Sequence, residues 1–248
     1  MRTARPTATH RTLVRVSATV LAGLFFTSSA FAHYLWVTID AKSGEHGTTN
    51  IYFEGGAGPG DGQYNDPFVK RGKTWIQTLN SEEPAEIKMA DTKKPGKRWL
   101  SAKLPKSGPR SVTSYGKWGV YRYGKTDVLL HYYSKLIDAD SSKDFYQLAR
   151  SKQLSLDVVP VQVESGYALQ VFWKDKPVEG KTVQIRGPKG FKATPKTDKD
   201  GIVKFEAEVT GRFTVKTTVE QKEEGEFEEK SYQLIRHNYT MLLTFPGN

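Results

Sequence analysis

The chain has 248 residues, no cysteine and a formal net charge of +10. The absence of cysteine excludes disulfides and thiolate metal sites, so stability must come from hydrophobic cores, and any metal ligand must be a histidine, carboxylate, amide or amine. The positive charges lie largely in loops and are offset by an acidic run over 220–229. This pattern argues against a nucleic-acid partner and is compatible with an anionic envelope component such as lipid head groups or an acidic polysaccharide.

Residues 1–32 have the organisation of a cleaved secretory signal peptide. Arginines are the only charges before the apolar run 18–26, and the segment ends in Ala30-Phe31-Ala32, a small-x-small cleavage site. The apolar run is too short for a membrane span, which needs about 20 residues, and no later stretch approaches that length. We therefore predict a mature protein that begins with His33, has no transmembrane segment and works in the periplasm or outside the cell. Loss of the four arginines lowers its net charge from +10 to +6.

The first half of the mature chain, residues 33–153, has the pattern of an antiparallel β-sandwich. Its start alternates in period two, so that His33 shares the inward face with Leu35 and Val37. The glycine-rich segment 54–67 lacks the lysine of a phosphate cradle, and the sequence predicts no helix after it, so we expect a surface loop.

One helix is expected, over 142–152, with Ser141 or Ser142 as its N-cap. It would connect the first sandwich to a second domain.

The segment 154–248 repeats the strand pattern and predicts a second sandwich of the immunoglobulin or transthyretin type. In its final strand, Ile235, His237 and Tyr239 alternate onto the inward face. The segment 197–201, Thr-Asp-Lys-Asp-Gly, predicts a tight turn in which Gly201 adopts a positive φ. The fold class is therefore mainly β, with two antiparallel β-sandwich domains joined by one short helix.

Three stretches together resemble a known bacterial family. They are the start Ala32-His33-Tyr34-Leu35-Trp36, the strand 129–135 with its terminal Tyr-Ser-Lys followed by the helix, and the second-domain stretches 156–160, 166–171, 176–183, 197–201 and 211–215. The chain resembles the exported domain-of-unknown-function family related to NikM, a component of nickel and cobalt uptake systems. The resemblance implies a role beside membrane uptake components, because the chain itself has no histidine-rich tract and no membrane helices. The second-domain stretches also resemble carboxypeptidase-regulatory-like and transthyretin-like modules, and those motifs specify fold only.

An amino-terminal His33 would offer two metal ligands, its α-amine and its ring Nδ1, which close a chelate ring on a metal ion. One more imidazole would complete a three-nitrogen site for copper, nickel, cobalt or zinc, with copper bound most tightly. His46 is a candidate, since the hairpin after the first strand could bring it beside the terminus with Glu45 in support. His131 and His237 are the others.

Each histidine also has a simpler interpretation. His131 and His237 would then be core histidines bonded to a neighbouring tyrosine or backbone group. His46 would be an exposed loop residue, and His33 a terminus that merely tolerates histidine.

The sequence leads to three hypotheses about the function of the protein. The leading hypothesis is an extracytoplasmic, non-enzymatic protein that binds nickel, cobalt or copper and assists metal uptake or handling. The first alternative is a structural or adhesive envelope module without a metal. The second is an enzyme like the copper polysaccharide monooxygenases, which also begin with histidine on a β-sandwich; aromatic side chains would then stack on sugars. The aromatics in question are Trp36, Tyr64, Trp75, Trp99 and Trp118.

Overall fold

The computed structural model describes Met1, residues 33–207 and residues 210–246. Apart from Met1, the predicted signal peptide and its cleavage site at Ala32 lie outside these residues. The described residues from His33 onward form one compact unit. No helix among the described residues is long and apolar enough to cross a membrane.

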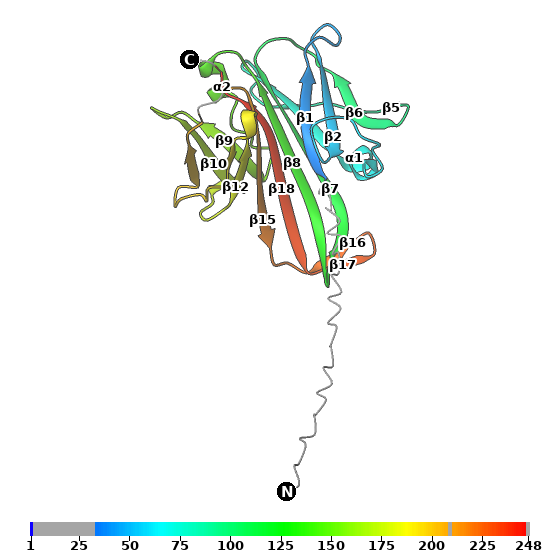
Figure 1. Cartoon of the computed structure of the whole chain (residues 1–248). Helices are drawn as coiled ribbons and strands as arrows, with labels where there is room; N and C mark the ends of the chain where they lie inside the picture. The colour runs from blue at the N-terminus through cyan, green and yellow to red at the C-terminus, as the bar shows by residue number, and fades with distance from the viewer. Residues whose placement is uncertain (2–32, 208–209, 247–248) are drawn as a thin grey trace. The chain divides into compact units, whose positions relative to one another are not determined.

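The fold is mainly β, as predicted, and its strands form three sheets and one separate hairpin (Figure 1). The N-terminal sheet has the order β1 (Tyr34–Asp40), β2 (Thr48–Glu54), β6 (Lys97–Lys103), β5 (Ala90–Lys94). The central sheet has the order β13 (Lys192–Ala193), β12 (Val183–Arg186), β15 (Arg212–Gln221), β18 (Leu234–Thr244), β8 (Thr126–Asp138), β7 (Arg110–Tyr123), β3 (Lys73–Thr78), β4 (Ala85–Glu86). The C-terminal sheet contains β9 (Leu156–Val161), β10 (Tyr167–Trp173), β11 (Lys176–Pro177) and β14 (Ile202–Phe205). The separate hairpin is β16 (Gly225–Phe227) with β17 (Lys230–Tyr232).

The central sheet runs through both predicted domains. Strand β18, from the second segment, pairs with β8, from the first, and this is a parallel pair among otherwise antiparallel ones. Parallel neighbours need a long crossover connection, and here the crossover is the whole of 139–233, which contains the C-terminal sheet. The two sandwiches therefore share one continuous sheet.

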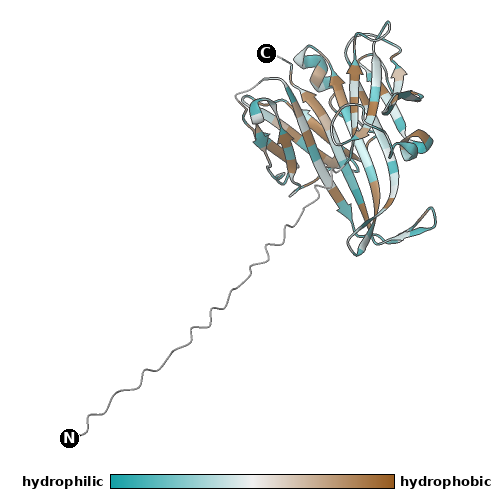
Figure 2. Cartoon of the chain, turned by 45° about the vertical axis from the view of Figure 1, so that its right-hand side comes forward, coloured by the Kyte–Doolittle hydropathy of each residue, from teal (hydrophilic) through white to brown (hydrophobic). Residues whose placement is uncertain are grey.

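Each face of the central sheet covers its own hydrophobic core. On one face the N-terminal sheet contributes Leu35, Val37 and Phe53, which pack with Leu130 and Tyr132. On the other face the C-terminal sheet packs on the residues that alternate with these: Tyr133, Ile137, Tyr239, Met241 and Leu243. Strands β8 and β18 are buried on both faces along most of their length, so polar residues such as Ser134, Lys135 and Thr240 are buried together with the apolar ones. Figure 2 shows hydrophobic bands interrupted by hydrophilic ones along the long strands of the sheets.

Buried hydroxyl groups fix β1 on the central sheet. Ser134 Oγ accepts a hydrogen bond from Val37 N at 3.1 Å, and Thr240 Oγ1 donates to the backbone oxygen of Leu35. Ser134 and Thr240 are themselves hydrogen-bonded at 3.1 Å. Strand β1 is thereby held at the seam between β8 and β18.

Helix α2 (Ser142–Gln147) is shorter than predicted. Its N-cap is Ser141, whose side chain accepts a hydrogen bond from Asp144 N, as expected. The predicted end at residue 152 is wrong, because the backbone beyond Leu148 bonds elsewhere: Ala149 O accepts from Lys135 Nζ, and Ser151 N donates to a buried carboxylate.

A second helix, α1 (Asp66–Arg71), closes the glycine-rich loop, so the expectation that no helix follows this loop is wrong. Proline stands in its first turn, where a missing N–H costs nothing. Phe68 anchors the helix against Phe53, with ring centroids 4.7 Å apart. The anchor requires a glycine at position 116, since a Cβ there would lie 2.3 Å from the Phe68 ring.

The turn predicted over 197–201 is confirmed. Gly201 has φ +74°, and Asp198 Oδ1 accepts hydrogen bonds from the backbone N–H groups of Asp200 and Ile202.

Candidate functional site

His33 lies directly before β1, with its ring among aromatic side chains. The ring centroid is 4.9 Å from that of Tyr64 and 5.7 Å from that of Phe53. Contact with Phe53 places His33 on the inward face, as the alternation predicted. Its Nε2 lies 3.7 Å from Oε2 of Glu54, and the His33 side chain is 25% exposed.

Glu54 is the residue that sequence reasoning missed at this position. It ends β2 directly opposite Tyr34, because β1 and β2 pair in an antiparallel hairpin whose register joins these two residues. Its Oε1 accepts a hydrogen bond from Gly62 N at 3.2 Å. A Cβ at Gly60 would lie 2.3 Å from the Glu54 carboxyl group. The glycine-rich loop therefore wraps closely around Glu54 and presents Tyr64 to His33.

If His33 were the first residue, its α-amine and Nδ1 would form a chelate pair, since Nδ1 is the ring nitrogen nearer the backbone. A carboxylate beside Nε2 is the usual way in which a metal-ligating imidazole is oriented and made more basic. Glu54 occupies that position relative to the ring of His33.

His46 lies at the opposite end of the same hairpin, in the turn between β1 and β2. Seven strand residues separate the two ends, which is roughly 20 Å at the rise of an extended strand. The expectation that the hairpin brings His46 beside the terminus is therefore wrong. Its ring is hydrogen-bonded to Ser107 Oγ at 2.9 Å through Nδ1, and its Nε2 lies 3.6 Å from Glu45, the predicted supporting residue.

His131 and His237 are brought together on neighbouring strands, in register across the parallel pair β8 and β18. Their ring centroids are 4.7 Å apart. Tyr115 Oη is 2.9 Å from His131 Nδ1, and Tyr133 Oη is 2.9 Å from His237 Nδ1. Both are thus core histidines bonded to neighbouring tyrosines, which is the simpler interpretation of the two.

This histidine pair is held in the neutral state. Burial, reinforced by the positive charge of Lys117, lowers the pKa of His131 to about 4. Burial also lowers the pKa of His237 to about 3, with further contributions from His131 and Lys174. His237 Nε2 is 3.0 Å from Gln221 Oε1, whereas the buried Nε2 of His131 has no hydrogen-bond partner among the described residues.

The four predicted ligands do not converge on one position. His131 shares its sheet face with Tyr133, in the C-terminal core, whereas His33 contacts Phe53 in the core on the other face. The central sheet therefore separates the histidine pair from His33. Across residues 33–207 and 210–246, no group of three or more histidine, cysteine, aspartate or glutamate side chains is placed to hold a metal ion.

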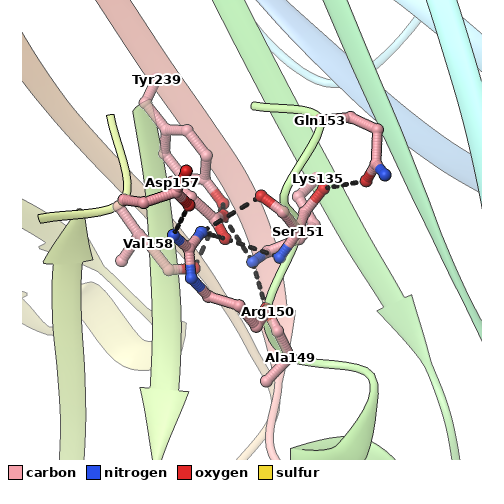
Figure 3. Close-up of polar contacts among 9 residues, drawn as sticks. Lys135, Ala149, Arg150, Ser151, Gln153, Asp157, Val158 and Tyr239 are labelled. Carbon is pink, nitrogen blue, oxygen red and sulfur yellow. Dashed lines mark hydrogen bonds and ion pairs between the residues drawn. The ribbon is translucent and has the colours of Figure 1, made fainter. Parts of the chain in front are cut away.

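A buried polar network that the sequence did not reveal joins the central and C-terminal sheets (Figure 3). Lys135 Nζ lies 2.6 Å from Oδ1 of Asp157, and both side chains are fully buried. Oδ2 of Asp157 accepts hydrogen bonds from Arg150 Nη1 and Ser151 N, each at 2.9 Å, and Tyr239 Oη lies 3.4 Å from Oδ1. Burial lowers the pKa of Lys135, and Asp157 opposes this shift.

This network connects elements rather than forming an open site. It links β8, β9, β18 and the segment after α2, and it satisfies the polar groups that these elements bury together. Lys135 and Asp157 both stand inside strands, each beside apolar residues, and a charged residue in that position is the signal that could have marked them.

The comparisons with known proteins give no relative in sequence. No family model matches the chain, and no curated protein matches it. Among solved structures, the D0-D1 domain of Intimin matches at 15% identity and a TM-score of 0.23, covering 84% of this chain and 97% of that chain. A likeness this weak says nothing about the function of this chain.

Proposed function

We propose that the protein is an extracytoplasmic binding protein for a divalent transition metal, nickel, cobalt or copper, and that His33 is its ligand-bearing amino terminus. The observation that carries the proposal is the position of Glu54, whose Oε2 lies 3.7 Å from His33 Nε2. Phe53 and Tyr64 hold the ring in place. A preoriented imidazole at a chain terminus supplies a chelating pair without further folding.

The same geometry limits the site to few protein ligands. None of the described histidines lies near His33, so the protein offers one amine, one imidazole and a neighbouring carboxylate. Coordination positions then remain for water or for a ligand from another molecule. An incomplete coordination shell favours exchange of the metal over its storage. Such a site suits a protein that transfers metal to uptake components.

Ligand chemistry and resemblance favour different metals. Two nitrogen ligands bind copper more tightly than nickel, and nickel more tightly than cobalt, by the usual order of divalent ions. The resemblance to the NikM-related family favours nickel or cobalt, and membership of that family is part of the proposal.

The test compares three mature proteins by calorimetric titration with Cu²⁺, Ni²⁺ and Co²⁺. The first begins at His33, the second carries one additional alanine before His33, and the third carries His46→Ala in the native-start protein. We expect one metal ion per native-start chain, loss of that binding in the extended form, and unchanged binding in His46→Ala. Equal uptake by the native and extended forms, or none by either, would refute the terminal site.

The envelope-module alternative is favoured by a separate observation. Apart from Met1, the large hydrophobic side chains that are exposed among the described residues are Tyr64, Val69, Tyr121 and Tyr123. Trp118 connects three of them, with ring centroids 6.4 Å from Tyr64 and 6.2 Å from Tyr121, which in turn is 4.9 Å from Tyr123. Exposed aromatic patches of this kind mark interaction surfaces.

A pair of variants separates this alternative from metal binding. If the protein serves assembly, Tyr121→Ser with Tyr123→Ser will abolish its co-sedimentation with envelope fractions, and the alanine-extended form will sediment normally. If it serves metal handling, the tyrosine variant will retain metal binding and the extended form will lose it. The monooxygenase-like alternative needs a second imidazole for a three-nitrogen copper site, and none of the described histidines supplies one beside His33.

A further inference from the structure

A cleft lies between the start of β1 and the strands β12 and β15 of the central sheet, with a volume of about 270 Å³. Strand β1 is the edge of the N-terminal sheet, and β12 and β15 lie beyond β18 in the central sheet (Figure 1). The residues that line the cleft come from both sides, so it opens beside the edge of β1. Tyr34 lines it from β1, and Lys216 lines it from β15.

Lys216 is the central side chain of this cleft. Its Nζ lies 3.6 Å from the ring centroid of Tyr34 and 5.0 Å from that of Trp36. Burial, reinforced by the positive charge of Arg186, lowers the pKa of Lys216 to about 8. The ammonium group is therefore half-buried, stabilised by aromatic faces and destabilised by a second cation.

The residues that line the cleft include Lys181 and Lys216 and no carboxylate. Among the ion pairs of the described residues, none within 4.0 Å involves Lys181, Arg186 or Lys216. By contrast, Arg122 is paired with Asp127 and Arg236 with Glu220. An anion in the cleft would reduce the repulsion between Lys216 and Arg186. It would also accept hydrogen bonds from Lys216 in place of those that burial removed.

The rest of the lining is suited to hydroxyl groups. Thr182, Gln184 and Thr218 face the cleft with exposed side chains, and they supply donors and acceptors around the lysines. The ring of Tyr34 adds an apolar face at the rim. A lipid head group would need an apolar surface nearby for its chains, and these polar side chains do not provide one.

We propose that this cleft binds a carboxylate-bearing sugar unit of an acidic polysaccharide. Lys216 and Lys181 take the carboxylate, and the threonine hydroxyls and Gln184 take the sugar hydroxyls. The site does not use His33, so this proposal can be tested independently of the metal-binding proposal.

The experiment uses the mature protein in EDTA, which removes any metal that could bridge His33 to a carboxylate. Calorimetry and NMR shifts are followed with three probes: a trigalacturonate, the neutral maltotriose and inorganic phosphate. The variants are Lys216→Met, Lys181→Gln, and Lys204→Met as a matched control on the exposed side of β14. Loss of a hydrogen bond to a charged group weakens binding about 10-fold or more.

The expected result is binding of trigalacturonate and not of maltotriose, with at least this loss in Lys216→Met and Lys181→Gln and none in Lys204→Met. His33→Ala should bind trigalacturonate as the native protein does, whatever it does with metals. Equal weakening by Lys204→Met would show non-specific attraction to a basic protein and would overturn the proposal. Binding of phosphate as tight as that of trigalacturonate would overturn its sugar component. Lys181 lies outside the strands, in the segment before β12, so Lys181→Gln keeps the test decisive even if Lys216→Met fails to fold.

Discussion

His131 and His237 lie side by side across the parallel pair of β8 and β18, with ring centroids 4.7 Å apart. Trp173 from the C-terminal sheet covers His237, with ring centroids 4.3 Å apart. Two neutral imidazoles are thus buried where the two sandwiches share one sheet. Their position makes the fold sensitive to acid.

We predict that stability falls as the pH drops below 6.5, because both histidines have folded-state pKa values well below their ordinary value of 6.5. Below pH 6.5 the unfolded chain binds protons at these histidines that the folded chain does not bind. The stability contributed by the two neutral histidines is therefore complete above pH 6.5 and is lost as the pH falls through about 4 and about 3. Each histidine contributes a slope of up to about 1.4 kcal/mol per pH unit. Urea unfolding at pH 7, 5.5 and 4.5 measures how the free energy of unfolding depends on pH.

The matched variants for this prediction are His131→Asn and His46→Asn. Asparagine at 131 keeps a polar group for Tyr115 and removes the titration, so its stability should fall less steeply with acid. His46→Asn changes a surface ring whose side chain is 32% exposed and should keep the native slope. A native protein equally stable at pH 7 and 4.5 would contradict the argument.

Replacing Lys135 by methionine should lower the free energy of unfolding by about 3–5 kcal/mol, because Asp157 would lose one of its two cationic partners within the core. Chemical denaturation at pH 7 checks this. Arg122→Gln removes one partner of an exposed ion pair, and its effect should be much smaller than that of Lys135→Met because water screens the pair. If both variants lose the same stability, burial does not set the strength of the Lys135–Asp157 pair.

Glu54→Gln should weaken metal binding at His33 by roughly 10- to 100-fold, as expected for loss of a carboxylate that orients a ligating imidazole. Metal titration of the native-start protein measures the change. Glu45→Gln, beside His46 at the far end of the hairpin, is the control and should bind metal normally. An unchanged affinity in Glu54→Gln would remove Glu54 from the site.

Gly116→Ala should destabilise the fold by about 1–3 kcal/mol, because the added Cβ would lie 2.3 Å from Phe68 and displace α1. Thermal unfolding and the Phe68 side-chain NMR signals report the change. Phe68→Leu in the same chain should recover part of the loss. Gly56→Ala has nothing within 4 Å of its added Cβ and should be neutral.

Local pattern was enough to predict the class of the fold and much of its inner faces. Alternation placed Leu35 and Val37 inward, and it placed His237 and Tyr239 together on one face of the last strand, because successive strand residues point to opposite sides. The turn at Gly201 and the cap at Ser141 followed from side-chain chemistry within a few residues. These features depend on near neighbours in the chain.

Tertiary structure alone decided which distant residues meet. The hairpin register placed Glu54, rather than His46, beside His33. The parallel pairing of β8 and β18 joined His131 to His237 across more than a hundred residues of chain. The periodicity of a strand sequence indicates which face a side chain is on, but not which distant residue it contacts. Those contacts depend on which strands pair, and strand pairing depends on the packing of whole sheets.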